Sequence, residues 1–154
     1  MKDTHTLSTQ AAQPVPWKIW LKTSRPFTLT ATVSPVIVGT AVAGYEGTFH
    51  LTTFLITFLS CLFLQIGTNY FNEYFDYRYG LDHSESLGAT TVIFRNEMTA
   101  TQVLTGGLVC FGIAALLGIA LIYIVGPVII LFGLTGMAIA YFYSARPFKF
   151  ASRG

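Results

Sequence analysis

A stretch without a single Asp, Glu, Lys or Arg runs from Met98 to Ala145: MTATQVLTGGLVCFGIAALLGIALIYIVGPVIILFGLTGMAIAYFYSA. A membrane-spanning helix needs about 20 apolar residues, because it rises about 1.5 Å per residue through a hydrocarbon core about 30 Å thick. The stretch is therefore too long for one crossing. It divides at Gly126-Pro127, since proline cannot continue a helix, and this predicts two spans over residues 101–124 and 127–144.

Two further charge-free runs lie upstream, from Pro26 to Tyr45 and from Gly47 to Asn72, and each is close to the length of one crossing. The predicted fold class is all-α, a multi-span transmembrane helix bundle with four spans. The composition agrees, because 10% of the 154 residues are charged and the mean hydropathy is +0.58, whereas soluble domains carry about 25% charged residues. A net charge of +2 argues against a nucleic-acid-binding protein.

The positive charges predict the orientation of the bundle. All nine Lys and Arg residues lie in the N-terminal segment, between the second and third predicted spans, or at the C-terminus, and the other two connections contain none. By the positive-inside rule, both ends of the chain face the cytoplasm, as expected for an integral, multi-pass protein of the cytoplasmic membrane. Residues 1–16 are expected to form a mobile cytoplasmic leader, and residues 17–154 the transmembrane domain.

Polar and acidic side chains that are candidates for a functional site gather in residues 65–82, QIGTNYFNEYFDYRYGLD. A helix places five polar side chains of this segment on one stripe, because they are spaced by three or four residues: Gln65, Asn69, Asn72, Glu73 and Asp76. Acids at a membrane edge are costly unless they face a cavity, so they are functional candidates. The alternative is a solvated helix end at the cytoplasmic surface.

Gly80 is expected to end this helix in a left-handed turn and to bring Asp82 back towards Asp76. An amide and several carboxylates that converge in this way suit Mg²⁺, which prefers oxygen ligands and commonly binds together with substrate phosphates. The predicted metal ligands are Asn72, Glu73, Asp76 and Asp82.

The segment Asn72–Asp82, NEYFDYRYGLD, resembles the first aspartate-rich motif of the UbiA-type intramembrane prenyltransferases, N-D-x-x-D-x-x-x-D, with Glu73 in place of an aspartate. Its variant N-[DE]-x-x-D-x-x-x-G-x-D resembles the branch that prenylates 1,4-dihydroxy-2-naphthoate on the way to menaquinone. The resemblance extends to residues 20–44, WLKTSRPFTLTATVSPVIVGTAVAG, and to residues 143–154, YSARPFKFASRG.

The resemblance implies a Mg²⁺-dependent transferase that moves a polyprenyl group from an allylic polyprenyl diphosphate to an aromatic acceptor within the lipid bilayer. It implies that Asn72, Asp76 and Asp82 are the catalytic residues that hold the metal and the diphosphate, with Glu73 beside them. The acceptor it favours is 1,4-dihydroxy-2-naphthoate. A same-family enzyme with another acceptor, such as 4-hydroxybenzoate, homogentisate or a glycerol phosphate, is an alternative.

Further polar residues are candidates for substrate binding. Arg25 and Arg95 are placed to reach phosphate oxygens, although both also fit a role in orienting the protein by the positive-inside rule. Asn69 either orients a ligand or forms a hydrogen bond with another helix. Arg146 and Lys149 follow the fourth predicted span and are the remaining substrate-binding candidates.

Members of the resembled family have about nine transmembrane helices and a second aspartate-rich motif in their later half. We therefore expect this chain to correspond to an N-terminal half that is inactive alone, with the other half supplied by a missing C-terminal part or by a second copy in a homodimer. The alternative from another class is a four-helix membrane protein without catalysis, such as a transporter subunit or an assembly factor. In that case the acids would form an ion pathway or a solvated helix end.

Overall fold

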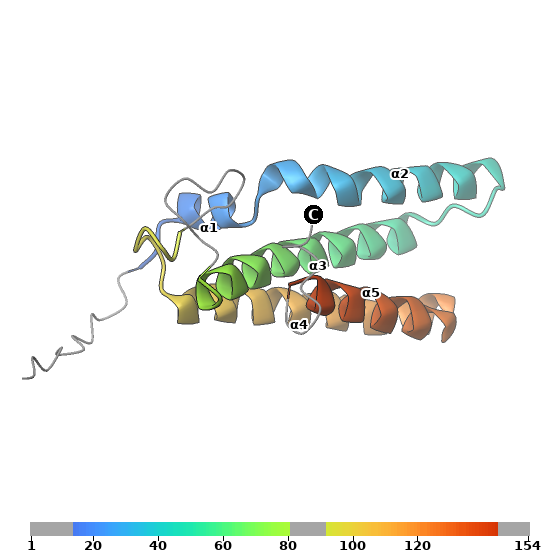
Figure 1. Ribbon diagram of the computed structural model, residues 1–154. Helices are drawn as coiled ribbons and strands as arrows, with labels where there is room; N and C mark the ends of the chain where they lie inside the picture. The colour runs from blue at the N-terminus through green and yellow to red at the C-terminus, as the bar shows by residue number, and fades with distance from the viewer. Residues whose placement is uncertain (1–13, 81–91, 145–154) are drawn as a thin grey trace, which may run out of the picture.

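The computed structural model describes residues 14–80 and 92–144. Within these two ranges every regular element is a helix, which confirms the all-α prediction. Figure 1 shows the long helices lying side by side, with a short helix at one end. The elements are α1 (Trp17–Thr23), the 3₁₀ helix η1 (Pro26–Leu29), α2 (Thr30–Tyr45), α3 (Leu51–Arg78), α4 (Ala100–Val125) and α5 (Val128–Ser144).

The predicted spans overlap these helices, although α3 continues to Arg78, beyond the charge-free run that ends at Asn72. Within residues 14–80 and 92–144, three segments are long and apolar enough to cross a membrane, namely Pro26–Tyr45, α3 and α4. The fourth predicted span is α5, a helix of 17 residues. The predicted break is also confirmed, because α4 ends at Val125, Gly126 follows with φ 117°, a backbone conformation that favours glycine, and Pro127 comes next.

Local signals set the helix ends near the acidic motif. Gly80 follows α3 with φ 64°, which confirms the predicted left-handed turn. At the start of α4, Thr99 and Gln102 form a capping box: the Gln102 backbone N–H donates to Thr99 Oγ1, and the Thr99 N–H donates to Gln102 Oε1. The expected position of Asp82, like the predicted mobility of residues 1–13, lies outside the described residues.

Helices α3 and α4 form the most extensive contact in the bundle, with α5 packed against both. A Cβ atom added at Gly67 of α3 would lie 3.3 Å from the Gly107 carbonyl oxygen of α4 and 3.2 Å from the Phe111 ring. Small residues let two helix backbones approach closely, so this glycine pair sets the distance between the two helices.

The buried core lies at one end of the bundle, where α1 and the turn at residues 92–98 cover α3 and α4. The Tyr70 hydroxyl donates to the Trp20 carbonyl oxygen at 3.0 Å, and the two rings meet edge to face at 5.8 Å between centroids. Lys22 forms an ion pair with Glu97 at 2.8 Å. We refer to this end, which also carries Arg25 and Glu73, as the charged end of the bundle.

Helix α2 is covered far less than the other long helices. It packs on α3, and none of its residues is buried. Large apolar side chains of α4 are exposed as well, including Leu116 and Tyr123. Such surfaces suit lipid or further helices, because lipid tails are as apolar as these side chains.

We expect Gly106→Ala to destabilise the bundle. A Cβ atom at this position would lie 2.6 Å from the Trp20 ring and 3.0 Å from the Tyr70 ring, so α1 or Tyr70 must move. Overpacking of this kind costs about 1–3 kcal/mol. The matched control is Gly112→Ala in the same helix, where a Cβ atom meets nothing within 4 Å. Denaturation in bicelles should show a lower midpoint for Gly106→Ala only, and equal midpoints would refute the contact.

Candidate functional site

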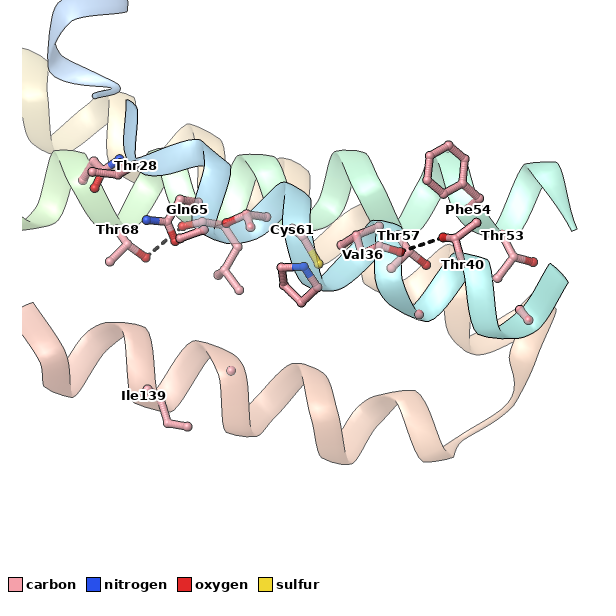
Figure 2. Close-up of a pocket in the computed structure, with 18 of the residues that line it drawn as sticks. Thr28, Val36, Thr40, Thr53, Phe54, Thr57, Cys61, Gln65, Thr68 and Ile139 are labelled. Carbon is pink, nitrogen blue, oxygen red and sulfur yellow. Dashed lines mark hydrogen bonds between the residues drawn. The ribbon is translucent and has the colours of Figure 1, made fainter. Parts of the chain in front are cut away.

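A groove of about 900 Å³ runs between α2 and α3, and α5 forms part of its wall through Gly136 and Ile139 (Figure 2). Its lining extends from Arg25 and Asn72 at the charged end to His50 at the opposite end of the helices. The groove therefore follows nearly the whole length of the two helices. A volume of this size falls within the range of about 300–1,000 Å³ that is usual for small-molecule sites.

Threonines account for much of the polar lining of this groove. The Thr40 hydroxyl donates to the Val36 carbonyl at 2.7 Å, and the Thr68 hydroxyl donates to the Leu64 carbonyl at 2.8 Å (Figure 2). Because these hydroxyls form hydrogen bonds within their own helices, they offer little to a ligand. Between them the lining includes the apolar side chains of Pro35, Val36 and Leu64, which suit an apolar chain.

The groove threonines were not among the site residues predicted from the sequence. A signal was present, because Thr53 and Thr57 of α3 are spaced by four residues, which places them on one helix face. The lining also includes Gln65 and Cys61 of α3.

Arg25 joins α1 to η1 in the left-handed region, with φ 51° and ψ 68°. This conformation costs a non-glycine residue about 1–2 kcal/mol, so neighbouring contacts must hold it. The Thr28 hydroxyl donates to the Arg25 carbonyl at 2.9 Å. The Asn69 amide donates both to the Ser24 carbonyl at 2.7 Å and to Thr28 Oγ1 at 2.9 Å. These bonds tie the chain on both sides of Arg25 to α3.

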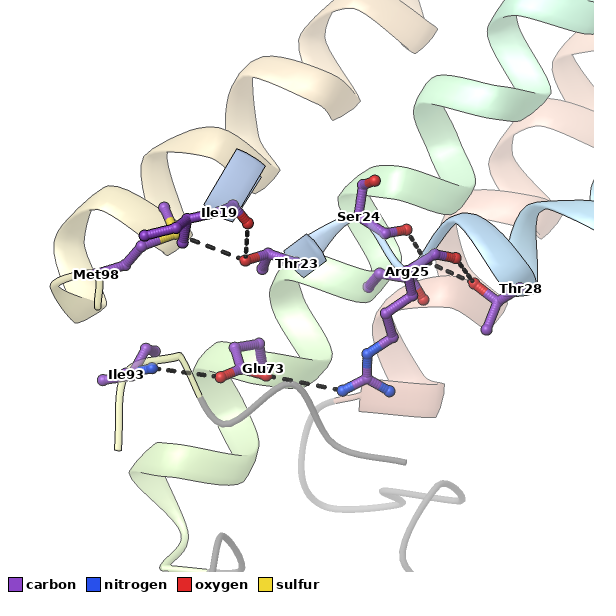
Figure 3. A network of polar contacts seen from close by, with 9 residues as sticks. Ile19, Thr23, Ser24, Arg25, Thr28, Glu73, Ile93 and Met98 are labelled. Atoms are coloured by element: carbon purple, nitrogen blue, oxygen red, sulfur yellow. Dashed lines mark hydrogen bonds and ion pairs between the residues drawn. The ribbon is translucent and has the colours of Figure 1, made fainter. Parts of the chain in front are cut away.

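Glu73 is completely buried on the side of α3 that faces Arg25 and the 92–98 turn. Its Oε2 lies 3.8 Å from Arg25 Nη2, and its Oε1 accepts a hydrogen bond from the Ile93 backbone N–H at 3.4 Å (Figure 3). A buried carboxylate is costly unless it is paired, and Arg25 supplies the opposite charge. Glu73 therefore links three separate segments at the charged end.

The Arg25 guanidinium retains unused hydrogen-bonding capacity. Its Nε and Nη2 atoms are buried and have no hydrogen-bond partner among the residues that the structure describes. Buried N–H groups of a charged side chain are normally hydrogen-bonded. Arg25 also lines the groove, so it is suited to bind an anionic group there.

The other predicted site residues lie in or next to the groove, in an exposed turn, or outside the described residues. Asn72 is 8% exposed and lines the groove, and Asp76 lies one helical turn further along α3, half-buried. Arg95 is exposed in the 92–98 turn and is not part of the groove lining. Asp82, Arg146 and Lys149 lie outside the described residues.

The residues at this end fit Mg²⁺ in the chemistry of their donor atoms. Asn72 and Asp76 offer an amide oxygen and a carboxylate from adjacent turns of one helix. No group of three or more Asp, Glu, His or Cys side chains forms a metal cluster within residues 14–80 and 92–144. Two protein ligands still suit Mg²⁺, which is usually bound by one or two carboxylates together with water and substrate phosphates.

Most of the chain is similar to proteins of one known family. The sequence pattern of the UbiA prenyltransferase family matches residues 32–153. Among curated proteins, the chain is 42% identical over 133 residues to the 1,4-dihydroxy-2-naphthoate octaprenyltransferase of Bacillus subtilis, which covers 86% of this chain and 42% of the relative. The protein of the same name from Escherichia coli is 33% identical over 143 residues, covering 88% of this chain and 46% of the relative.

A third relative with that name, from Mycobacterium tuberculosis, is 28% identical over 137 residues and covers 88% of this chain and 47% of its own length. The chain thus spans about half the length of the curated relatives it matches. No solved structure matches it.

Proposed function

The chain belongs to the UbiA prenyltransferase family, and from that premise we propose that it forms the donor-binding part of an enzyme that transfers a polyprenyl group from an allylic polyprenyl diphosphate to an aromatic acceptor. The proposed acceptor is 1,4-dihydroxy-2-naphthoate, the compound in the names of the relatives, and the proposed pathway is menaquinone biosynthesis. The observation that carries this proposal is the groove, which joins a charged end to a long apolar wall.

The two parts of the groove match the two parts of the donor. The wall between α2 and α3 offers apolar side chains, and the hydroxyls of two of its threonines, Thr40 and Thr68, are already bonded within their own helices, as suits a polyprenyl tail. The charged end offers Arg25 and Asn72 to the diphosphate, with Asp76 one turn away.

We propose that Asn72, Asp76 and Asp82 hold the diphosphate together with Mg²⁺, and that Arg25 contacts the phosphate oxygens directly. When bound, Mg²⁺ supplies positive charge that stabilises the departing diphosphate. In the transfer itself, the allylic C–O bond breaks, an aromatic carbon bonds to the prenyl carbon, and the ring loses a proton. Transfer also requires that water be kept away from the reacting carbon.

The apolar helices and the family together identify an integral, multi-pass membrane protein. We propose that its charged end faces the cytoplasm, because Arg78 and Arg95 lie at that end while the α2–α3 and α4–α5 connections contain no Lys or Arg. Single cysteines introduced at Ser8 and at Thr48 should react with membrane-impermeant reagents from opposite sides. Labelling of both from the same side would contradict this orientation.

A chimera tests the proposed function. Residues 17–154 would replace the matching segment of the Bacillus subtilis relative, and membranes would receive polyprenyl diphosphate, 1,4-dihydroxy-2-naphthoate and Mg²⁺. We expect prenylated naphthoate, and we expect none when EDTA removes the metal. The unmodified relative is the positive control.

A chimera that is inserted in the membrane but gives no product would argue against the proposal. Parallel reactions with 4-hydroxybenzoate or homogentisate test the acceptor. Faster transfer to either of these would keep the prenyl transfer and reject the proposed acceptor.

A further inference from the structure

The polar stripe of α3 divides into two edges at the charged end. Asn72 and Glu73 are adjacent in sequence, so they point about 100° apart around the helix. Asn72 lines the groove, whereas Glu73 is buried between Arg25 and the Ile93 backbone (Figure 3). The two residues therefore meet different partners, although one motif contains both.

Asn69 and Glu73 are one helical turn apart and contact the same segment of chain. Asn69 holds the backbone on both sides of Arg25, through the Ser24 carbonyl and the Thr28 hydroxyl. Glu73 lies against the Arg25 side chain. Backbone and guanidinium of this one residue are thus fixed by two neighbouring side chains of α3.

The Arg25 guanidinium, although it is held by Glu73, does not use all of its N–H groups in hydrogen bonds. Its Nε and Nη2 atoms are buried and lack a hydrogen-bond partner in the described part of the chain. Its side chain is 20% exposed, and the residue lines the groove beside Asn72. Because both of these atoms are buried and Nη2 is the one that faces Glu73 Oε2, an anion in the groove would be bound through Nη1, by charge-assisted bonds, which are the strong ones.

We propose that Glu73 and Asn69 are positioning residues that hold Arg25 at the charged end of the groove, where its guanidinium binds the diphosphate of the donor independently of the metal. In this arrangement Glu73 is the counter-ion of Arg25 and not a metal ligand. The identity of the anion rests on the proposed function, whereas the anion site itself rests on the contacts described above.

The direction in which Glu73→Gln changes the affinity for an anion distinguishes a positioning role of Glu73 from a purely electrostatic effect on Arg25. Glu73→Gln removes a negative charge close to Arg25 and keeps an oxygen that accepts from the Ile93 N–H. Electrostatics alone would then make an added anion bind more tightly. If Glu73 positions Arg25, the anion binds more weakly. If Glu73 instead binds the metal, the substitution changes anion binding only when Mg²⁺ is present.

The experiment measures binding of inorganic diphosphate to the full chain in uncharged lipid nanodiscs by calorimetry, once with EDTA and once with Mg²⁺. With EDTA, we expect binding to weaken at least about 10-fold for Arg25→Gln and for Glu73→Gln, as the loss of a charged hydrogen bond predicts. Asp76→Asn should weaken binding with Mg²⁺ only. Arg78→Gln removes the same charge from an exposed site and is expected to bind like the parent chain.

A second pair of variants covers the case in which Glu73→Gln does not fold. Thr28→Val removes the hydroxyl that bonds to the Arg25 carbonyl and accepts from Asn69, while the side chain keeps its shape. Its matched control is Thr30→Val, which loses a hydroxyl that bonds to the Phe27 carbonyl and lies outside the groove lining. We expect a several-fold loss of metal-free diphosphate binding for Thr28→Val and none for Thr30→Val.

Three results would overturn the proposal: no metal-free binding by the parent chain, tighter binding by Glu73→Gln, or an effect of Glu73→Gln that is confined to the samples with Mg²⁺. The proposed function fails separately, through a chimera without product. If the chimera gives no product but the variants weaken diphosphate binding in EDTA as expected, the anion site is established without the proposed function. If the chimera is active but one of the three results is found, the proposed function stands and the role of Glu73 is rejected.

Discussion

Replacing Asp76 by Asn is expected to reduce prenyl transfer by the active chimera at least ~100-fold, since loss of groups that merely support metal ligands already costs about 10–100-fold. The substitution keeps the size of the side chain and removes its negative charge. Asp76 lies one turn after Asn72, at the end of α3 where the groove meets the charged end. If Asp76 is a ligand as proposed, Mg²⁺ and the departing diphosphate would be held less well without this carboxylate. Asp82→Asn is expected to have the same effect, as the last acid of the motif.

Product formation at saturating donor and a series of Mg²⁺ concentrations measures this effect. The matched control is Glu46→Gln, which removes a carboxylate from the exposed connection after α2, at the opposite end of the bundle. We expect normal transfer from the control and partial recovery of Asp76→Asn at high Mg²⁺. Turnover by Asp76→Asn close to that of the unsubstituted chimera would reject Asp76 as a metal ligand.

The helices were predictable because a membrane imposes one strong rule on sequence. Charged side chains are expensive in lipid, so charge-free runs mark the spans directly. The two breaks were predictable for an equally local reason. Gly80 and Gly126 adopt positive φ, which glycine tolerates and most other residues do not, and Pro127 cannot continue a helix.

The role of Asn69 was not predictable in the same way. The sequence left open whether its amide meets a ligand or another part of the protein, and the structure gives both of its donated bonds to protein, at Ser24 and Thr28. These partners lie more than 40 residues away along the chain and include a main-chain carbonyl, which every residue possesses. Nothing in the identity of Ser24 therefore marks it as a partner.

The sequence indicated that Glu73 and Asn72 point in different directions, although it did not indicate the partner of Glu73. In the sequence motif, Glu73 stands next to Asn72, but a helix turns about 100° between adjacent residues. The two side chains therefore belong to different edges of the stripe, and the partner of each depends on which segment packs there. That segment is the one around Arg25, and its path back to α3 is a tertiary contact that spacing alone does not define.

The second large effect concerns residues 1–154 expressed alone, which we expect to yield no prenylated product. The groove has walls from α2, α3 and α5, but α2 has no buried residue, and its main contact with another long helix is with α3. A reacting allylic carbon in such a site is not shielded from water, and water would intercept it before the acceptor does. The chain also spans about half the length of its relatives.

The measurement compares membranes that contain residues 1–154 with membranes that contain the chimera, at equal protein levels and with the same polyprenyl diphosphate, Mg²⁺ and naphthoate. We expect diphosphate binding from both and product from the chimera only, because binding needs the charged end of the groove whereas transfer needs an enclosed one. Product from residues 1–154 alone would mean that the α2 face is closed by another copy of the chain or that an open groove suffices. A cross-linking cysteine on the exposed face of α2, at Val38, distinguishes these two cases, since a paired copy gives a covalent dimer and an open groove does not.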